Sequence, residues 1–244
     1  MKPIIKINLF FLIFFSLLAP RIVWSSESLR EAQIWACRAV SSLLLVRGEG
    51  HQQQHVDRMN QDLVNTSSQL QQAGKMDDPT IRESFDTLRE VLNQGVEAGP
   101  NEEDLPWRYP QWLSQALSQF LLAIEENLSD EAKGMELVAL EFLTVQYLSK
   151  SYIGTYELPR EHNDQFIGQD EVILVPVIDK YMASESLSNK DVARWQFIRK
   201  ALADLNSRSS TWASVSGKPF VPLMVDYYVR TLGTADALGN TPPS

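Results

Sequence analysis

Apolar residues recur three or four positions apart along most of this chain, and the stretches that carry them contain little glycine or proline. In one representative segment, Ile81, Phe85 and Leu88 share a helical face behind a proline that suits a first helical turn. Only residues 172–178 are rich in β-branched side chains, and we interpret them as a proline-kinked helix because a lone strand would have no partner. The sequence therefore predicts an all-α protein, a multi-helix bundle of about seven to eight helices.

Turn residues divide the chain into sections. Residues 26–98 are predicted to form an N-terminal helical section, in which a glycine turn at Gly48–Gly50 joins two helices into a hairpin and a third helix follows. Residues 99–106 read as a linker or loop. Residues 107–232 form a C-terminal helical section, which we expect to pack with the first as one domain.

The most apolar helix is expected after Ser129–Glu131, whose residue types suit a helix N-cap. It carries Leu140, Phe142 and Val145 among many other apolar residues, and we predict that it lies at the centre of the bundle. The chain ends in residues 233–244, where Gly, Thr, Pro and Ser predominate. We predict a flexible tail there.

Residues 1–25 have the pattern of a cleaved signal peptide. Lys2 and Lys6 give a positive start, an apolar stretch follows, and Ser25 provides a small residue before a cleavage site at Ser26. The apolar stretch is shorter than the roughly 20 residues that a membrane-spanning helix needs. We therefore expect an exported protein that is periplasmic or secreted, with no membrane insertion after signal cleavage.

The net charge limits the possible partners, and the cysteine content bears on the compartment and on lipid attachment. The chain has a formal net charge of −9, which disfavours binding to nucleic acid or to an anionic membrane surface. Its only cysteine, Cys37, cannot form an intramolecular disulfide, which favours bacterial over eukaryotic export. Lipid attachment at Cys37 is disfavoured because the bulky Trp35 precedes it and the apolar stretch lies far upstream.

His51 and His55 are the most specific local pattern in the sequence. On a helix, residues four apart share one face, so both imidazoles could hold one Cu or Zn ion, with Met59 one turn further along. Against this, the segment is polar and no acidic or cysteine ligand lies nearby in the sequence. We favour a solvated helix face, and no cofactor is required by the sequence.

A second candidate is the polar segment 152–164, which follows the most apolar helix. It contains Tyr152, Tyr156, Arg160 and His162, and the carboxylates beside His162 suit a general base or a ligand-binding site. No nucleophile is evident in the sequence. A charged, solvated corner between two core helices is the interpretation we favour.

Two further motifs have a functional and a structural interpretation. Trp107 and Arg108 could stack on a ligand or form an interface, but we favour a role in which Trp107 and Trp112 fasten a helix start to the core. Residues 214–220 precede a helix and could receive an anion at its N-terminus. They lack the Walker pattern, so we favour a proline-shaped turn.

Three functional hypotheses follow. The first is a periplasmic binding or protein-interaction module, which takes a small-molecule ligand or docks on an envelope protein. Its candidate ligand-binding residues are Tyr152, Tyr156, Arg160, His162, Trp107 and Arg108. The second is a metal-handling protein that uses His51, His55 and Met59. The third is an uncommon enzyme centred on residues 152–164, because the common hydrolase, metalloprotease and dinucleotide-binding motifs are missing.

Overall fold

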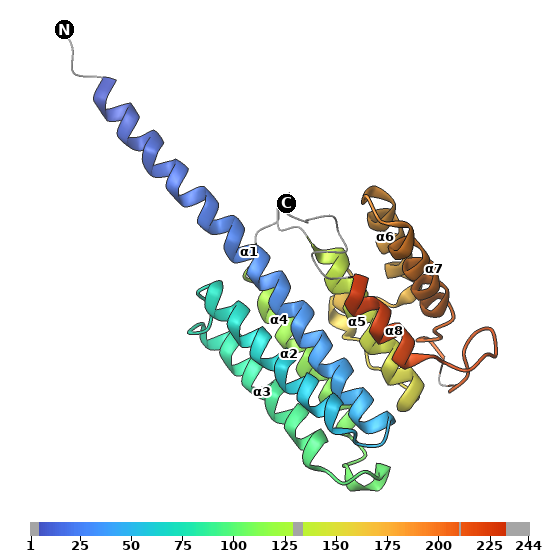
Figure 1. The fold of residues 1–244 in the computed structure, drawn as a ribbon. Coiled ribbons are helices and arrows are strands. Elements are labelled where there is room, and N and C mark those ends of the chain that lie inside the picture. Colours follow the sequence, from blue (N-terminus) through green and yellow to red (C-terminus); the bar gives the residue numbers. More distant parts are fainter. Residues whose placement is uncertain (1–4, 129–133, 210, 233–244) are drawn as a thin grey trace.

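A computed structural model describes residues 5–128, 134–209 and 211–232, with side chains from Ser26 onward except that of Glu102. All regular structure in these ranges is helical, which confirms the predicted all-α bundle (Figure 1). The predicted cap at Ser129–Glu131 and the predicted tail at 233–244 lie outside the described residues. The helices are α1 (Ile5–Gly48), α2 (Gln53–Gln72), α3 (Pro79–Glu97), α4 (Tyr109–Glu125), α5 (Met135–Tyr152), α6 (Glu171–Ser184), α7 (Asn189–Ala203) and α8 (Pro222–Leu232).

Helix α1 is the common packing partner of the bundle. Its most extensive contact is with α2, and it also touches α3, α4, α5 and α8. The turn between α1 and α2 forms where the sequence predicts it, and Gly50 adopts a φ of 83° that suits glycine. The two helices therefore lie antiparallel, as Figure 1 shows.

Helix α5 is buried on every side. Each residue from Val138 to Lys150 is buried, and the helix contacts α1, α6, α7 and α8. This confirms the predicted central helix, and its buried residues include polar side chains such as Glu141 and Gln146 beside the apolar ones. Helix α6 covers residues 172–178 with Pro176 inside it, so the helical interpretation of that segment is confirmed.

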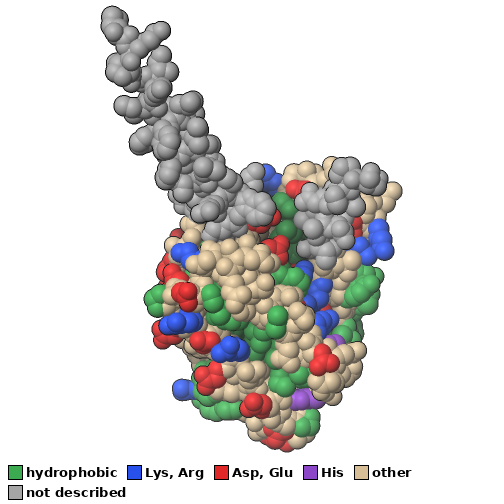
Figure 2. Space-filling model, turned by 60° about the vertical axis from the view of Figure 1, so that its left-hand side comes forward, with side chains coloured by type: hydrophobic (Ala, Val, Ile, Leu, Met, Phe, Trp, Pro, Cys, Tyr) green, Lys and Arg blue, Asp and Glu red, His purple; other side chains and the backbone are tan. Residues whose placement is uncertain are grey.

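One hydrophobic cluster joins both halves of the chain. It includes Leu43 of α1, Phe120 of α4, Phe142 of α5 and Ile198 of α7, and all four are buried. Among the described residues, none of the helices combines the length and the apolarity needed to cross a membrane. On the face in Figure 2, acidic and basic side chains are interspersed rather than separated into patches of one sign.

A network of charged side chains lies within this core. Glu141 of α5 accepts a 2.7 Å hydrogen bond from Arg38 of α1, and both side chains are 4% exposed. Arg230 of α8 pairs with Asp62 of α2 at 3.0 Å and with Asp226 of its own helix at 2.9 Å. The network therefore ties four helices together at one place.

Arg230 is held by further interactions within the network. Arg230 also donates to the backbone carbonyl of Arg38 at 2.7 Å. Burial alone would lower the pKa of Arg230, but the carboxylates of Asp226 and Asp62 outweigh it and raise that pKa. Removal of one partner would leave buried charges uncompensated.

We expect Arg230→Ala to lower the free energy of unfolding by about 3 to 5 kcal/mol, because the buried Asp62 would lose its cation and Asp226 would keep only Arg58, 3.1 Å away. Arg89→Ala is the matched control, since Arg89 pairs with Asp86 where both side chains are about half exposed. Its effect should stay within about 0.5 kcal/mol. Urea denaturation followed by circular dichroism measures both, and equal effects would contradict a stabilising role for the buried network.

Candidate functional site

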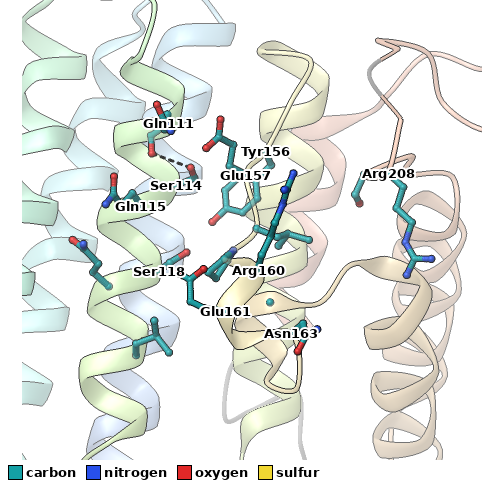
Figure 3. A pocket seen from close by; sticks show the side chains of 16 residues that line it. Gln111, Ser114, Gln115, Ser118, Tyr156, Glu157, Arg160, Glu161, Asn163 and Arg208 are labelled. Carbon is teal, nitrogen blue, oxygen red and sulfur yellow. Dashed lines mark hydrogen bonds between the residues drawn. The ribbon is translucent and has the colours of Figure 1, made fainter.

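A cavity lies between helix α4 and the chain that follows α5. Its volume is about 1020 Å³, and Figure 3 shows polar side chains of α4 on one wall and residues of the segment 156–163 on the other. This volume is at the upper end of the range for small-molecule pockets, roughly 300–1000 Å³. Tyr156 and Arg160, both predicted ligand-binding residues, line it.

The wall on α4 is a stripe of uncharged polar side chains. They are spaced three and four residues apart, so the helix presents them on one side, while its apolar residues enter the core on the other. Ser114 satisfies its hydroxyl by donating to the Gln111 backbone carbonyl at 3.0 Å. The stripe consists of Gln111, Ser114, Gln115, Ser118 and Gln119.

The opposite wall is positioned by the end of α5. Gly154 has a φ of 87°, and a Cβ there would lie 2.5 Å from the Trp212 ring, so only glycine fits this reversal. The chain then runs past Tyr156, whose ring meets Phe142 of α5 edge-on at 5.7 Å. Phe166 also contacts the Phe142 ring, with 5.8 Å between the two ring centroids. The central helix therefore holds this wall in place through Phe142.

Two hydroxyl groups beside the cavity are closed to solvent. The Oγ of Ser118 and the OH of Tyr156 are both buried, and Ser118 is only 4% exposed. Burial raises the pKa of Tyr156, and a hydrogen-bond interaction with the Ser118 hydroxyl lowers it in part. Each hydroxyl is therefore within reach of the other, and neither is accessible to a ligand in the cavity.

The charged residues of the cavity are of both signs. Among the described residues, Glu157, Arg160 and Glu161 make no ion pair, and each is exposed. Arg208, which also lines the cavity, forms an ion pair with Asp170. A second guanidinium nitrogen of Arg208 donates to the other Asp170 carboxylate oxygen at 3.1 Å. The cavity therefore has no strong net charge.

A smaller pocket of about 270 Å³ lies where the end of α1 meets the loop before α4. Trp107 and Tyr152, 45 positions apart in the sequence, both line it. Tyr152 donates to the Glu49 carboxylate at 2.5 Å, and burial together with that carboxylate raises its pKa. The segment 152–164 is thus divided, because Tyr152 faces this pocket and Tyr156 faces the cavity.

The expectation that tryptophans fasten α4 to the core is wrong. Trp107 is 82% exposed and Trp112 is 39% exposed. The anchor is Tyr109, which is 2% exposed and donates to the Val91 carbonyl of α3 at 2.8 Å. Arg108 instead lies over the exposed Trp107 ring, with its guanidinium carbon 4.8 Å from the ring centroid.

His162 lies apart from both pockets. It is half-buried in the short 3-10 helix η2 (Arg160–His162) and lines neither the cavity nor the smaller pocket. Its side chain makes no hydrogen bond with the residues that the structure describes. The structure thus brings Tyr156 and Arg160 together at the cavity, but it leaves His162 outside.

The structure separates the predicted metal ligands. His51 lies before α2 with a φ of 58°, so it does not share a helix face with His55. His51 Nε2 is 2.9 Å from an Arg47 nitrogen, and His55 Nδ1 is 3.4 Å from an Arg58 nitrogen. Burial, and then the neighbouring arginine, lowers the pKa of each imidazole.

The sulfur-containing side chains of Met59 and Cys37 are enclosed in the core. Met59 is 1% exposed within the core. Cys37 is fully buried, and burial, followed by the charge of Glu141, raises its thiol pKa. Within the described ranges, no group of three His, Cys, Asp or Glu side chains is placed to hold a metal ion.

The loop before α8 already holds a carboxylate of the chain itself. The backbone N–H and the hydroxyl of Ser216 donate to the two oxygens of Asp204 at 2.5 and 2.7 Å. Asp204 follows the last residue of α7. The Asp204 carboxylate therefore occupies the anion position that we considered for this loop. This contact agrees with the structural turn that we favoured for residues 214–220.

The polar stripe of α4 was not among the predicted site residues. Its signal is visible in the sequence, because Gln and Ser recur at helical spacing from Gln111 to Gln119. The chain matches no family model, no curated protein and no solved structure in the comparisons made, so the site stands on its own geometry.

We expect His51→Ala combined with His55→Ala to leave calorimetric titrations with Cu and Zn unchanged. Each imidazole lies beside an arginine, whose charge opposes a metal cation. His162→Ala is the control for nonspecific binding to a histidine. A binding isotherm that the double variant abolishes and His162→Ala preserves would contradict this expectation and support the metal-handling hypothesis.

Proposed function

We propose that this protein is an exported binding module that captures a ligand in the cavity between α4 and residues 156–163. The amides of Gln111, Gln115 and Gln119, which line one wall of this cavity of about 1020 Å³, carry the proposal. A ligand that occupies a cavity of this size can form hydrogen bonds with these amides. The signal pattern of residues 1–25 supports export, with a bacterial periplasm as the compartment we favour.

Binding without catalysis is the better account of this cavity. Its lining contains serine and tyrosine hydroxyls but no histidine, lysine or cysteine. A nucleophilic serine needs a base within hydrogen-bond reach, and the group beside Ser118 is the Tyr156 hydroxyl. Burial raises the pKa of Tyr156, so that hydroxyl stays protonated at neutral pH.

The cavity also has the construction of a binding site. One wall is a single helix with its apolar side in the core, and the other is held by Phe142 of the central helix. Rigid supports of this kind keep polar groups in place before a ligand arrives, which reduces the entropy lost on binding. The surface residues Glu157, Arg160 and Glu161 lie at the opening and remain available to a ligand.

We expect Gln115→Trp to abolish ligand retention. Gln115 lies on an exposed position of α4 in the cavity wall, so an indole there occupies the cavity without entering the core. Gln94→Trp, at an exposed position of α3, is the matched control. Native mass spectrometry of protein recovered from the periplasmic fraction should show a bound mass with the wild type and with Gln94→Trp only.

Two results of that experiment would count against the proposal. One is wild-type protein that is repeatedly ligand-free, and the other is a bound mass that Gln115→Trp retains. The same spectra report the chain mass, which should correspond to an N-terminus at Ser26 if the signal is cleaved as the sequence predicts. An uncleaved chain would contradict the export part of the proposal alone.

A further inference from the structure

A separate pocket of about 600 Å³ lies between the C-terminal end of α7 and the loop before α8, two helices that lie against each other (Figure 1). We infer that this α7–α8 pocket binds a free single-chain amphiphile with one carboxylate, the chemistry of a fatty acid. The pocket shares no lining residue with the cavity beside α4, so the inference stands independently of the proposed function.

The floor of the α7–α8 pocket is apolar. Phe197 of α7, Tyr147 of α5 and Val221 line it. The Tyr147 hydroxyl already accepts a hydrogen bond from the Val221 N–H at 3.1 Å, so it is engaged within the protein. Small-molecule sites usually combine mostly apolar walls with a few polar groups, in volumes of roughly 300–1000 Å³. This floor therefore suits an aliphatic chain.

The apolar surface continues beyond the pocket along α8. Leu223, Met224 and Tyr227 are exposed on this helix, whereas its charged residues, Asp226 and Arg230, pair with each other in the buried network. A helix at a protein surface normally presents charged and polar side chains to water, and an exposed apolar face marks a binding surface. The outer face of α8 therefore offers a place for more of the chain.

The pocket and the exposed face of α8 are joined. Val221, Met224 and Tyr228 are spaced three and four residues apart, so they share one face of the helix. The Tyr228 ring meets the Phe197 ring of the pocket edge-on, with 5.1 Å between the centroids. An aliphatic chain that enters the pocket can therefore remain on apolar surface as it leaves.

Three cations line the pocket, and one of them has no carboxylate to balance it. Arg199 donates to both carboxylate oxygens of Asp179, at 2.7 and 2.8 Å. Burial alone would raise the pKa of Asp204, but hydrogen bonds from the loop and then the charge of Lys218 lower it, which places Lys218 near that carboxylate. Among the residues that the structure describes, Lys200 makes no ion pair.

One unbalanced ammonium matches one carboxylate. A phosphate head carries a charge of about −1.5 to −2 at neutral pH, more than Lys200 alone compensates. A cationic head would meet Arg199, Lys200 and Lys218 at the same rim. A neutral head would leave Lys200 without a counter-charge. The cationic rim and the apolar floor together therefore favour a monoanionic amphiphile.

The charge of the whole chain favours a free amphiphile over a larger anionic partner. An anionic bilayer, or a second copy of this chain, would face a protein with a formal net charge of −9. A single carboxylate responds mainly to charges within the screening length of about 8 Å. At the rim of the α7–α8 pocket those charges include Lys200.

The test is isothermal titration of the protein with decanoate, kept below its micelle-forming concentration, and with decanol and decyl phosphate. We expect decanoate to bind most tightly. Lys200→Gln should weaken decanoate about tenfold and leave decanol unchanged, because it removes only the contact with the charged head. Val221→Glu should weaken both ligands about tenfold, because it places a carboxylate on the floor that the chain covers.

Each variant has a matched control. Lys190→Gln removes the same charge at the opposite end of α7, and Val64→Glu adds the same carboxylate at an exposed valine of α2. Both should bind decanoate as the wild type does. All four side chains are exposed, so thermal unfolding of every variant should stay close to that of the wild type.

Three results would overturn the inference. One is decanol or decyl phosphate that binds as tightly as decanoate, or decanoate binding that Lys200→Gln does not weaken. Another is binding to phosphatidylglycerol vesicles with no binding of free decanoate. The third is a dimer in light scattering that Val221→Glu dissociates, because a second copy would then cover this face.

Gln115→Trp separates this inference from the proposed function. Decanoate binding that Gln115→Trp abolishes would place the ligand in the cavity beside α4, which overturns the α7–α8 assignment and supports ligand capture in that cavity. Decanoate binding that depends on Lys200 and Val221 but not on Gln115 would support the α7–α8 site, even if native spectra show no ligand in the cavity.

Discussion

Desolvated charge is the constraint on which the helix arrangement depends. Arg38, Glu141, Asp62, Asp226 and Arg230 come from four helices, and each is stable in the core only while its partners are in place. The network thereby joins α1, α2, α5 and α8 through charges that lose their compensation when one partner is removed.

The cavity lies beside this fixed centre and depends on it indirectly. Helix α5 carries Glu141 of the network and, close by in the sequence, Phe142, which supports the Tyr156 wall. Helix α4 is placed separately, through its apolar face and through the bond from Tyr109 to α3. Two walls with separate supports therefore enclose the polar space.

The predictable parts of the fold are those decided by local pattern. Apolar spacing located the helices, and the many apolar residues of α5 placed that helix at the centre. The sequence pattern could not show whether Trp107 or Tyr109 anchors the start of α4. The answer depends on a backbone carbonyl of α3 that the Tyr109 hydroxyl reaches. Likewise, His51 leaves the helix face because the preceding glycine turn continues through it. The cavity joins segments about forty residues apart, beyond the reach of helical spacing.

The buried position of Cys37 has a consequence for the route by which the chain reaches its folded state. In an oxidising compartment, an exposed thiol can cross-link two chains or be oxidised by small molecules. Packing of α1 removes this thiol from solvent and raises its pKa, so little reactive thiolate remains. If the chain is exported as proposed, the interval between translocation and packing of α1 is therefore the period in which this thiol is open to oxidation.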